Sequence, residues 1–384
     1  MAPLALPDVA LPPPQPPAGA SSQLMSAPLA QLLSQHVPGW AGVTTDTLLL
    51  TPMCLAMSNL VFRVTCAYSP HAPALLLKLY GDGRSGGSGG DAPPSLVDRD
   101  HELRAATHLS SLGMGPDILL VWPGGRVEKW LHAAPLLSEE MREPIVAASL
   151  ASSLASFHAA CRPLLSSPRD ALWARMRRWA ADAAAQCGDL SADARFGPTL
   201  LLAPAWIDAL HAALGDLPTS FVHADVQHLN VLKCVSNAPC SAQTSGEPVV
   251  LQLIDFEYAM EAPACFDVGN HFCERAADYS PGAEHRGGML SYSDRYPSLA
   301  ARVAFCAAFL GGGVAGSGAG EAEALAGRAE VGALASHLLW GCWGVIKAKA
   351  SPSADFDYGA YADARFAELR RHAERLGFAI PQGR

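Results

Sequence analysis

The chain has 384 residues, a formal net charge of −9 at pH 7 and hydrophobic side chains at 50% of its positions. At roughly 100–200 residues per domain, this length predicts two domains and excludes a disulfide-stapled miniprotein. The hydrophobic content excludes a chain that is disordered throughout. The acidic balance argues against a nucleic-acid or anionic-membrane partner and suits a cationic small molecule.

The first 40 residues contain no Lys or Arg, so they lack the charged region of a secretory signal and the Arg-rich face of a transit peptide. They include the Pro-rich run 11–17, and we expect residues 1–40 to be a flexible, Pro- and Ala-rich tail. The 10 cysteines form no CxxC pair, which predicts reduced thiols in a cytoplasmic protein.

The uncharged windows 303–320 and 331–346 are the candidate membrane spans of the sequence. The first breaks up into Gly and Ser, and the second is shorter than the roughly 20 apolar residues that a span needs. We therefore expect no membrane insertion.

The first domain, 41–134, is predicted to hold a small antiparallel sheet, because its apolar runs are bounded by turn-forming residues. The predicted elements are strands at 47–51, 59–65, 74–80, 118–121 and 125–131 and a helix at 98–112. Between them, the Gly- and Ser-rich stretch 81–95 predicts a flexible insertion. It contains a G-x-G-x-x-G match that opens no helix, so we do not interpret it as a dinucleotide site.

The second domain, 135–384, changes to long Ala- and Leu-rich helices. The predicted elements are helices at 144–161 and 171–186, a β-hairpin formed by 229–235 and 249–256, and a Gly-rich insertion at 311–320. A strand-rich part followed by a helix-rich part is typical of an α+β protein, here with a small N-terminal lobe and a larger C-terminal lobe.

The most informative motif lies at the start of the hairpin. His223, Asp225 and Asn230 have the H-x-D-x-x-x-x-N spacing of a kinase catalytic loop, and Asp255 ends the next predicted strand. Phosphoryl transfer needs a carboxylate beside the attacking hydroxyl and oxygen ligands that hold Mg2+ against the phosphates. The motif predicts Asp225 as the base and Asn230 and Asp255 as magnesium ligands. The alternative is that these residues merely cap a hairpin, and the Ile-Asp-Phe sequence placed one strand later argues against it.

A kinase also needs a cation at the phosphates. Lys78 lies within an apolar strand, where a charge is costly unless it is paired or used. Glu102 on the following predicted helix is its expected partner, as in the strand Lys and helix Glu pair of kinase-like folds. The alternative is a surface-facing Lys on an edge strand.

Aromatic residues suggest an ammonium pocket. Trp340 and Trp343 are three positions apart, so they share a helix face. Aromatic faces closed by a carboxylate such as Glu274 bind ammonium groups by cation–π attraction and ion pairing. The alternative is that both tryptophans are core residues.

Taken together, these motifs resemble the choline/ethanolamine kinase family. The matching stretches are the loop from His223 to Asn230, Ile254-Asp-Phe-Glu-Tyr258, Phe266 to Glu274, and Leu339-Trp-Gly-Cys-Trp343. The resemblance spans about 47–373, and the Phe-Cys-Glu and Ala-Ala-Asp-Tyr sequences look most like plant-type choline kinases. It implies a bilobal protein-kinase-like fold and ATP-dependent, Mg2+-dependent phosphorylation of an amino alcohol.

The resemblance also implies roles for individual residues. Asp225 would activate the substrate hydroxyl, Gln227 would help to position it, and Asn230 and Asp255 would hold Mg2+. The implied ammonium pocket consists of Glu274, Tyr279, Trp340, Trp343 and Tyr361. The implied ATP site, between the lobes, consists of Ser58, Asn59, Lys78 with Glu102, and an adenine-binding connector that includes Glu128 and Trp130.

The chain departs from the family pattern at four places. Leu55-Ala-Met-Ser-Asn59 lacks the flexible glycines of the usual phosphate loop, and Lys78 stands where Arg is common. Ala224 stands where Asn is usual. Arg275 follows Glu274 where an apolar or aromatic residue is commoner, and we expect this cation to weaken ammonium binding.

The leading hypothesis is a choline kinase that also accepts ethanolamine. The alternatives are an ethanolamine kinase, an aminoglycoside-type phosphotransferase, and a catalytically weak nucleotide-binding pseudokinase. An aminoglycoside-type enzyme would not explain the paired tryptophans, and the altered loop before Asn59 is the feature that favours a pseudokinase. Members of the resembled family are often dimeric, which leaves a homodimer open.

Overall fold

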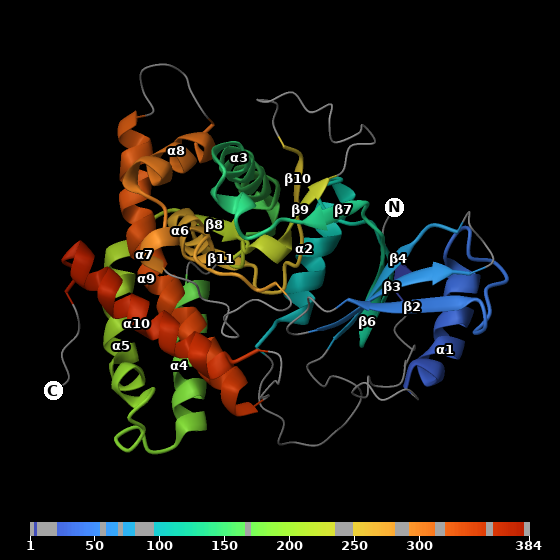
Figure 1. The fold of residues 1–384 in the computed structure, drawn as a ribbon, viewed down its shortest axis with the longest axis horizontal. Coiled ribbons are helices and arrows are strands. Elements are labelled where there is room, and N and C mark those ends of the chain that lie inside the picture. The colour runs from blue at the N-terminus through green and yellow to red at the C-terminus, as the bar shows by residue number, and fades with distance from the viewer. Residues whose placement is uncertain are drawn as a thin grey trace. The chain divides into compact units, whose positions relative to one another are not determined.

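In the computed structural model, the described residues are 4–5, 21–53, 59–67, 72–80, 96–165, 170–234, 249–280, 292–311, 319–350 and 356–379. The chain divides into two compact units, Met1–His132 and Ala133–Arg384, and Figure 1 labels their elements. The division falls at 132/133, where the sequence analysis placed a boundary at 134/135.

The first unit contains a six-stranded sheet in the order β1-β5-β6-β4-β3-β2. The strands are β1 (Leu4–Ala5), β2 (Leu48–Met53), β3 (Asn59–Cys66), β4 (Leu75–Tyr80), β5 (Ile118–Trp122) and β6 (Gly125–Lys129). All neighbouring pairs are antiparallel except β1 with β5. The five predicted strands are confirmed, and the Gly-rich stretch 81–95 lies outside the described residues.

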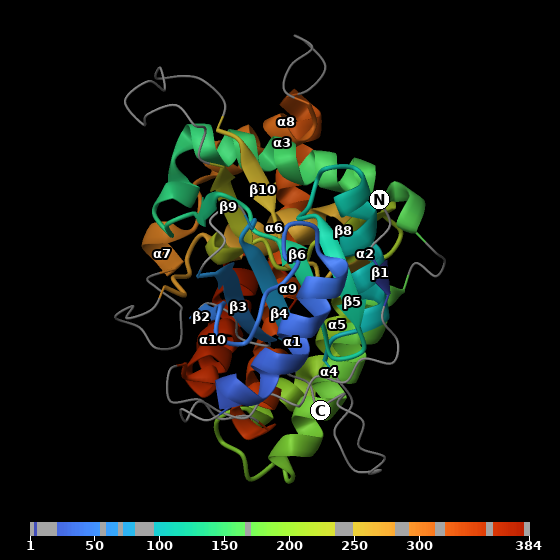
Figure 2. The same ribbon diagram turned by 90° about the vertical axis from the view of Figure 1, so that its right-hand side faces the viewer.

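The two faces of this sheet carry different side chains, because alternate residues of a strand point to opposite faces. On β4, Leu75, Leu77 and Leu79 belong to the apolar core that also contains Leu29 and Leu33 of helix α1 (Ser21–His36), shown beside the sheet in Figure 2. Lys78 points to the opposite face. Helix α2 (Arg99–Ser111) lies on that side of the sheet. It begins after the N-cap Asp98, and the predicted helix at 98–112 is confirmed.

The expectation of a flexible tail over residues 1–40 is wrong for its second half. Leu29 and Leu33 of α1 are fully buried and Trp40 is 1% exposed. The Trp40 indole N–H donates to the Pro73 carbonyl at 3.1 Å. Leu29, Leu32 and Leu33 recur at helical spacing, and the apolar area that they bury offsets the cost of a proline inside the helix. The Pro-rich run 11–17 lies outside the described residues.

The second unit is mostly helical (Figure 1). Its helices are α3 (Pro144–Ala160), α4 (Ala171–Cys187), α5 (Gly197–Leu214), α6 (Ala264–Glu274), α7 (Tyr292–Arg295), α8 (Leu299–Phe309), α9 (Ala319–Ala350) and α10 (Tyr358–Leu376), with 3-10 turns at Glu140–Arg142, Arg162–Leu164 and His228–Asn230. The predicted helices at 144–161 and 171–186 are confirmed. Residues 312–318 of the Gly-rich insertion lie outside the described part, and the stretch 319–320 already belongs to α9.

Two small antiparallel sheets interrupt these helices. Strand β8 (Thr219–Val222) pairs with β11 (Met260–Pro263), and β9 (Val231–Cys234) lies between β7 (Ala133–Pro135) and β10 (Leu251–Leu253). The predicted hairpin is therefore present as β9 and β10, but its strands are shorter than expected. Gln227 caps a 3-10 turn before β9, and the left-handed backbone of Asp255, with φ of +63°, ends the extended segment after β10.

Helix α9 runs through the middle of the second unit. Gly332 of α9 and Gly269 of α6 lie where the two helices touch, and a Cβ at either position would collide with the backbone of the other helix. These glycines let α6 approach closely, which places its C-terminal residue Glu274 beside the second half of α9.

By length and composition, Gly320–Ala350 could cross a membrane, with a mean hydropathy of 1.2 over its most apolar window. The helix is longer than the uncharged run 331–346 within it, because Gly320–Ala350 also includes charged residues at both ends. However, 94% of that window is buried inside the structure. The apolar surface of α9 is already covered by protein.

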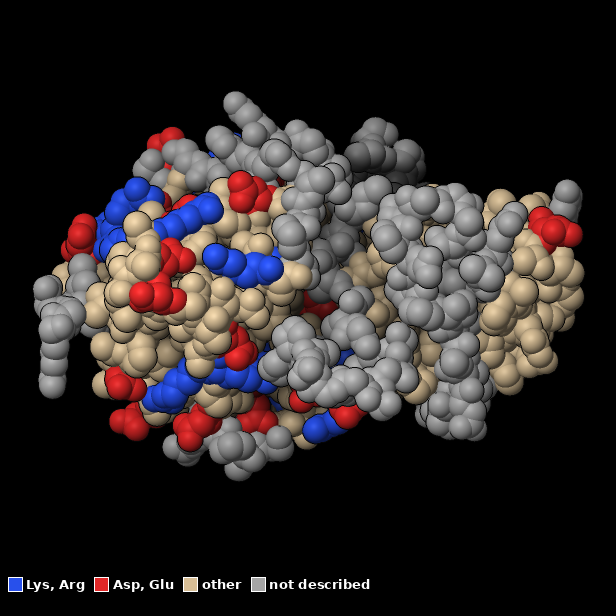
Figure 3. Space-filling model, turned by 90° about the horizontal axis from the view of Figure 1, so that it is seen from below, with Lys and Arg blue, Asp and Glu red and all other residues tan. Residues whose placement is uncertain are grey.

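Charged side chains are mixed on the surface that Figure 3 shows. In that view, Lys and Arg are interspersed with Asp and Glu over the described residues, so neither sign of charge forms a broad continuous patch there.

Candidate active site

The predicted Lys–Glu pair is formed in the first unit. The Lys78 ammonium lies 3.1 Å from Glu102 Oε1, and both side chains are buried. The alternative of an edge-strand Lys is wrong, because β4 lies between β3 and β6. Because successive side chains of a strand point to opposite faces, Lys78 points toward α2 while the leucines beside it point into the apolar core.

Glu102 also holds two arginines that the sequence analysis missed. Arg99 Nη1 lies 2.6 Å from Glu102 Oε2, and Arg126 Nη1 lies 2.7 Å from Oε1. Burial alone would raise the pKa of Glu102, but the charges of Lys78, Arg126 and Arg99 lower it strongly. Two signals could have revealed them, since Arg126 is the β6 partner of Lys78 and Arg99 precedes Glu102 by one helical turn.

Three cationic side chains gather in this buried cluster. Its cations are Lys78, Arg99 and Arg126, and its carboxylates are Glu102 and Glu128, which accepts from Arg126 Nε at 2.5 Å. Ammonium and guanidinium groups gathered in this way are suited to bind an anionic group such as a phosphate.

The other residues predicted for the ATP site have separate surroundings. Asn59 Oδ1 accepts from Arg99 Nη2 at 2.9 Å, so it joins the cluster, whereas Ser58 lies outside the described residues. The half-buried ring of Trp130 lies under the Arg63 guanidinium, 5.0 Å from the ring centre. The adenine-binding role of Glu128 and Trp130 stays a prediction.

In the second unit, Asp267 of α6 holds the catalytic loop in place. Its carboxylate accepts from the backbone N–H groups of His223 and Ala224, both at 2.8 Å, and lies 2.7 Å from His158 Nε2. Ala224 has a left-handed backbone, with φ of +67°. Burial would raise the pKa of Asp267, but these hydrogen bonds and the histidines lower it. The anchored loop therefore depends on a charged carboxylate.

The loop brings Asp225 and Asn230 together. Asn230 Nδ2 donates to Asp225 Oδ2 at 2.7 Å and to the Asp225 carbonyl at 3.0 Å. His223 supports them, since its Nδ1 accepts from the Asp225 N–H at 3.3 Å and its Nε2–H donates to the Ile254 carbonyl at 2.9 Å. Burial lowers the pKa of His223, which keeps the imidazole neutral, as this arrangement requires.

Asp255 is carried to the same place by the neighbouring strand. The Ile254 N–H donates to the Asn230 carbonyl at 3.0 Å, so β9 and β10 bring residues 230 and 255 close. Burial, together with the charges of Glu274, Asp255 and Glu257, raises the pKa of Asp225 well above its usual range. The three residues predicted for phosphoryl transfer thus lie together in an acidic setting.

The residues present fit a magnesium ion. Carboxylate and amide oxygens are the ligands that Mg2+ prefers. The Asn230 amide nitrogen donates to Asp225. Its Oδ1 accepts no hydrogen bond from any side chain or backbone group that the structure describes. That oxygen and a carboxylate oxygen of Asp255 would hold such an ion.

Gln227, which the resemblance placed near the substrate, has a structural contact. Its Oε1 accepts from the Leu229 N–H at 2.9 Å and so caps the turn His228–Asn230. Its predicted positioning role stays a prediction.

The predicted aromatic residues of the ammonium pocket lie together in the second unit. Trp340 and Trp343 on α9 have ring centres 5.5 Å apart, Trp343 lies 5.9 Å from Tyr361 on α10, and Tyr361 lies 6.5 Å from Tyr279. Tyr258, which the sequence analysis did not select, completes the group, because its hydroxyl accepts from the Trp343 indole N–H at 3.0 Å. The contacts among Tyr258, Trp340, Trp343 and Tyr361 are edge-to-face, and the Tyr279 ring is tilted against Tyr361.

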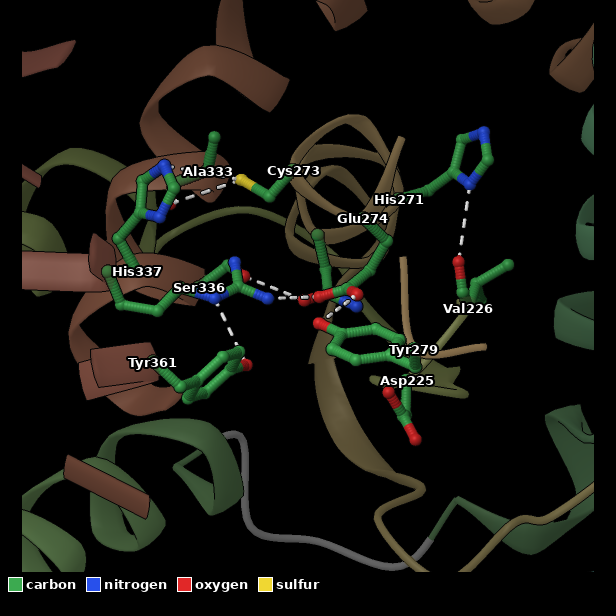
Figure 4. Close-up of polar contacts among 12 residues, drawn as sticks. Asp225, Val226, His271, Cys273, Glu274, Tyr279, Ala333, Ser336, His337 and Tyr361 are labelled. Atoms are coloured by element: carbon green, nitrogen blue, oxygen red, sulfur yellow. Dashed lines mark hydrogen bonds and ion pairs between the residues drawn. The ribbon is translucent and has the colours of Figure 1, made fainter. Parts of the chain in front are cut away.

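Glu274 closes this aromatic group. The Tyr279 hydroxyl donates to Glu274 Oε2 at 2.8 Å (Figure 4). Arg365 Nη2 donates to Oε1. Arg365 is fully buried and its Nε donates to the Tyr361 hydroxyl at 3.0 Å. The sequence analysis missed Arg365, although it follows Tyr361 by one helical turn, a spacing that could have suggested the contact.

Arg275 is buried at the C-terminal end of α6. Burial and the charge of Arg142 lower its pKa to about 10, and its charge contributes to lowering the pKa of His271. The cation–π contacts among the described rings do not include Arg275. Its expected weakening of ammonium binding stays a prediction.

These features define a class of protein. A strand Lys paired with a helix Glu, and a half-buried loop Asp held by an Asn five residues later, belong to protein-kinase-like phosphotransferases. The comparison with known proteins identifies the family. The model of the choline/ethanolamine kinase family matches residues 50–370, and the chain belongs to this family. It is a small-molecule kinase that uses ATP to phosphorylate an alcohol.

Individual relatives agree with this assignment. "Probable choline kinase 3" of Arabidopsis thaliana is 30% identical over 88% of this chain and 91% of its own length. "Choline/ethanolamine kinase" of Homo sapiens is 30% identical over 85% of this chain and 80% of its own. Among solved structures, a choline kinase from Cryptosporidium parvum Iowa II is 20% identical and has a TM-score of 0.71, covering 92% of this chain and 97% of that one. The expected α+β, protein-kinase-like fold is confirmed.

Proposed function

We propose that this kinase phosphorylates choline, using ATP and Mg2+, and that ethanolamine is a poorer acceptor. The product would be phosphocholine, which feeds phosphatidylcholine synthesis. The observation that carries the proposal is the buried group of Tyr258, Trp340, Trp343 and Tyr361 beside Glu274, in the same unit as Asp225.

The substrate preference rests on the chemistry of the two ammonium groups. A quaternary ammonium has no N–H group to satisfy and is weakly hydrated, so aromatic faces bind it well. A primary ammonium needs acceptors for three N–H donors. The names of the Arabidopsis and human relatives, with choline in both and ethanolamine in one, support this order of preference.

Asp225 would act as the general base on the acceptor hydroxyl. Its raised pKa makes it a stronger base than an ordinary carboxylate, and the hydrogen bond from Asn230 orients its Oδ2. Asn230 and Asp255 would hold Mg2+, which, when bound, neutralises negative charge on the phosphates. In the first unit, Lys78 with Arg99 and Arg126 would compensate phosphate charge, since these three cations are held close together by Glu102.

The test is ATP consumption by the purified protein with Mg2+, with choline, ethanolamine, an aminoglycoside or no acceptor. Choline should give the highest kcat/KM, and Asp225→Asn should lower kcat by about 100-fold or more. A higher kcat/KM for ethanolamine would make the protein an ethanolamine kinase. Silence with every acceptor while ATP still binds would favour a pseudokinase. The cytoplasmic location and the homodimer stay predictions, which fractionation and light scattering can test.

A further inference from the structure

Glu274 is already neutralised and hydrogen-bonded before any substrate arrives. Arg365 Nη2 donates to Oε1 and the Tyr279 hydroxyl donates to Oε2 at 2.8 Å, so each carboxylate oxygen has a donor. Glu274 is 1% exposed and Arg365 is fully buried, so water does not screen this ion pair. Figure 4 shows the Tyr279 hydroxyl pointing at the Glu274 carboxylate.

Arg365 is itself held in place. Its Nε donates to the Tyr361 hydroxyl at 3.0 Å, and its guanidinium carbon lies 5.1 Å from the centre of the Tyr361 ring. A planar guanidinium that donates to two different groups keeps one orientation. It therefore stays paired with Glu274 and does not shift to other positions in the pocket. The same arginine therefore orients the Tyr361 side of the pocket and pairs with the carboxylate at its end.

We propose that Arg365 is a specificity-determining residue, which makes the pocket prefer a quaternary over a primary ammonium by occupying and neutralising Glu274. The inference rests on the proposed function, because it concerns the choice between choline and ethanolamine at the same site. Arg365 acts through Glu274 and is a positioning residue.

The reason lies in what each ammonium group loses on leaving water. A primary ammonium gives up strong hydration and must recover it as charge-assisted hydrogen bonds, which an occupied carboxylate provides poorly. A quaternary ammonium has no N–H groups, so the occupied carboxylate costs it less and the aromatic faces still attract it. Removing the guanidinium would leave Glu274 Oε1 without its donor and the negative charge of the carboxylate unpaired. Both cations would then be attracted, but the primary one would gain hydrogen bonds as well.

The experiment compares choline with ethanolamine in three variants and a control. Arg365→Met removes the cation, Arg365→Lys keeps it, and Tyr279→Phe keeps the ring but frees Oε2. The control is Arg371→Met, which breaks the ion pair between Arg371 and Glu368. This pair is on the same helix as Arg365, and the Arg371 side chain is exposed. The readouts are kcat and KM for each acceptor, KM for ATP, and the two dissociation constants from calorimetry.

Arg365→Met should lower the choline-to-ethanolamine ratio of kcat/KM by about tenfold or more, which is the size expected for one charge-assisted hydrogen bond. The change should appear in the KM values and dissociation constants of the acceptors, with the KM for ATP unchanged. Tyr279→Phe should shift the ratio in the same direction by less. Arg365→Lys should restore much of the preference, and Arg371→Met should leave the ratio as it is.

An unchanged ratio in Arg365→Met and Tyr279→Phe would overturn the inference, as would an equal change for both acceptors. If Arg365→Met does not fold, Tyr279→Phe and Arg365→Lys still decide it. The failure of the proposed function looks different, since the unaltered protein would then turn over neither acceptor. Calorimetry on that protein and on Tyr279→Phe would still test the preference, and no binding of either ammonium compound would overturn both.

Discussion

Asp267 accepts a hydrogen bond at 2.8 Å from the backbone N–H of Ala224, a residue whose φ is +67°. A side chain on α6 thus compensates a left-handed backbone conformation directly before the candidate base. Such conformations cost of order 1 kcal/mol and persist where surrounding contacts determine them. The same carboxylate holds the preceding N–H of His223, which makes α6 the support of the whole loop.

Asp267→Asn should therefore destabilise the protein and the loop. An amide cannot accept from the two backbone N–H groups and His158 with the strength of a carboxylate, so the free energy of unfolding should fall by about 2 kcal/mol or more. The pKa of Asp267 is lower in the folded chain, so its contribution is present above about pH 4, the ordinary value, and is lost as the pH falls through the folded value. Urea titrations at several pH values should show a deficit that shrinks in acid. An equal deficit at all pH values would contradict the assigned charge.

Asp225→Asn should lower kcat by about 100-fold or more, the usual contribution of a general base. The substitution preserves size and a hydrogen bond to Asn230 but removes the proton acceptor. Binding of ATP should persist, and nucleotide titration with calorimetry measures it. Substantial turnover by this variant, with choline as the acceptor, would show that another group takes the proton.

Glu102→Gln should destabilise the first unit, because Lys78, Arg99 and Arg126 would lose the carboxylate they share. Removing one partner of a buried ion pair costs about 3–5 kcal/mol, and thermal or urea unfolding measures the loss. A matched control is Asp117→Asn, whose ion pair with Lys129 in the same unit is exposed and should be worth at most about 1 kcal/mol. Similar effects of the two substitutions would argue against a coupled cluster.

Trp343→Leu should raise the KM for choline by about tenfold, since it removes one aromatic face and the donor to the Tyr258 hydroxyl. The KM for ATP should change little. Trp206→Leu is the control, because Trp206 is equally buried but stacks on Phe378, away from the aromatic group. If both variants raise the choline KM alike, Trp343 is a core residue, as one interpretation of the sequence has it.

Local patterns predicted much of this protein. Strands 59–65 and 74–80, the helix after Asp98 and the pairing of Lys78 with Glu102 all follow from periodicity, capping and the cost of an unpaired charge in an apolar strand. Helix α1 was missed because its proline and the Pro-rich run before it outweighed the leucine spacing. The hairpin ends were misplaced because Gln227 and Asp255 act through a cap and a backbone angle, which a count of apolar residues does not reveal.

The sequence by itself determined the kind of chemistry, since the order and spacing of Asp225, Asn230 and Asp255 name a phosphotransferase wherever the chain folds. Only the tertiary structure decided which charged side chains pair with one another. Glu274 and Arg365 are 91 positions apart, and His158 and Asp267 are 109 apart. Spacing along the chain does not show which side chains meet over such separations. The protonation and hydrogen-bond capacity of a buried carboxylate depend on the groups within a few ångströms of it, and helix packing alone brings those groups together.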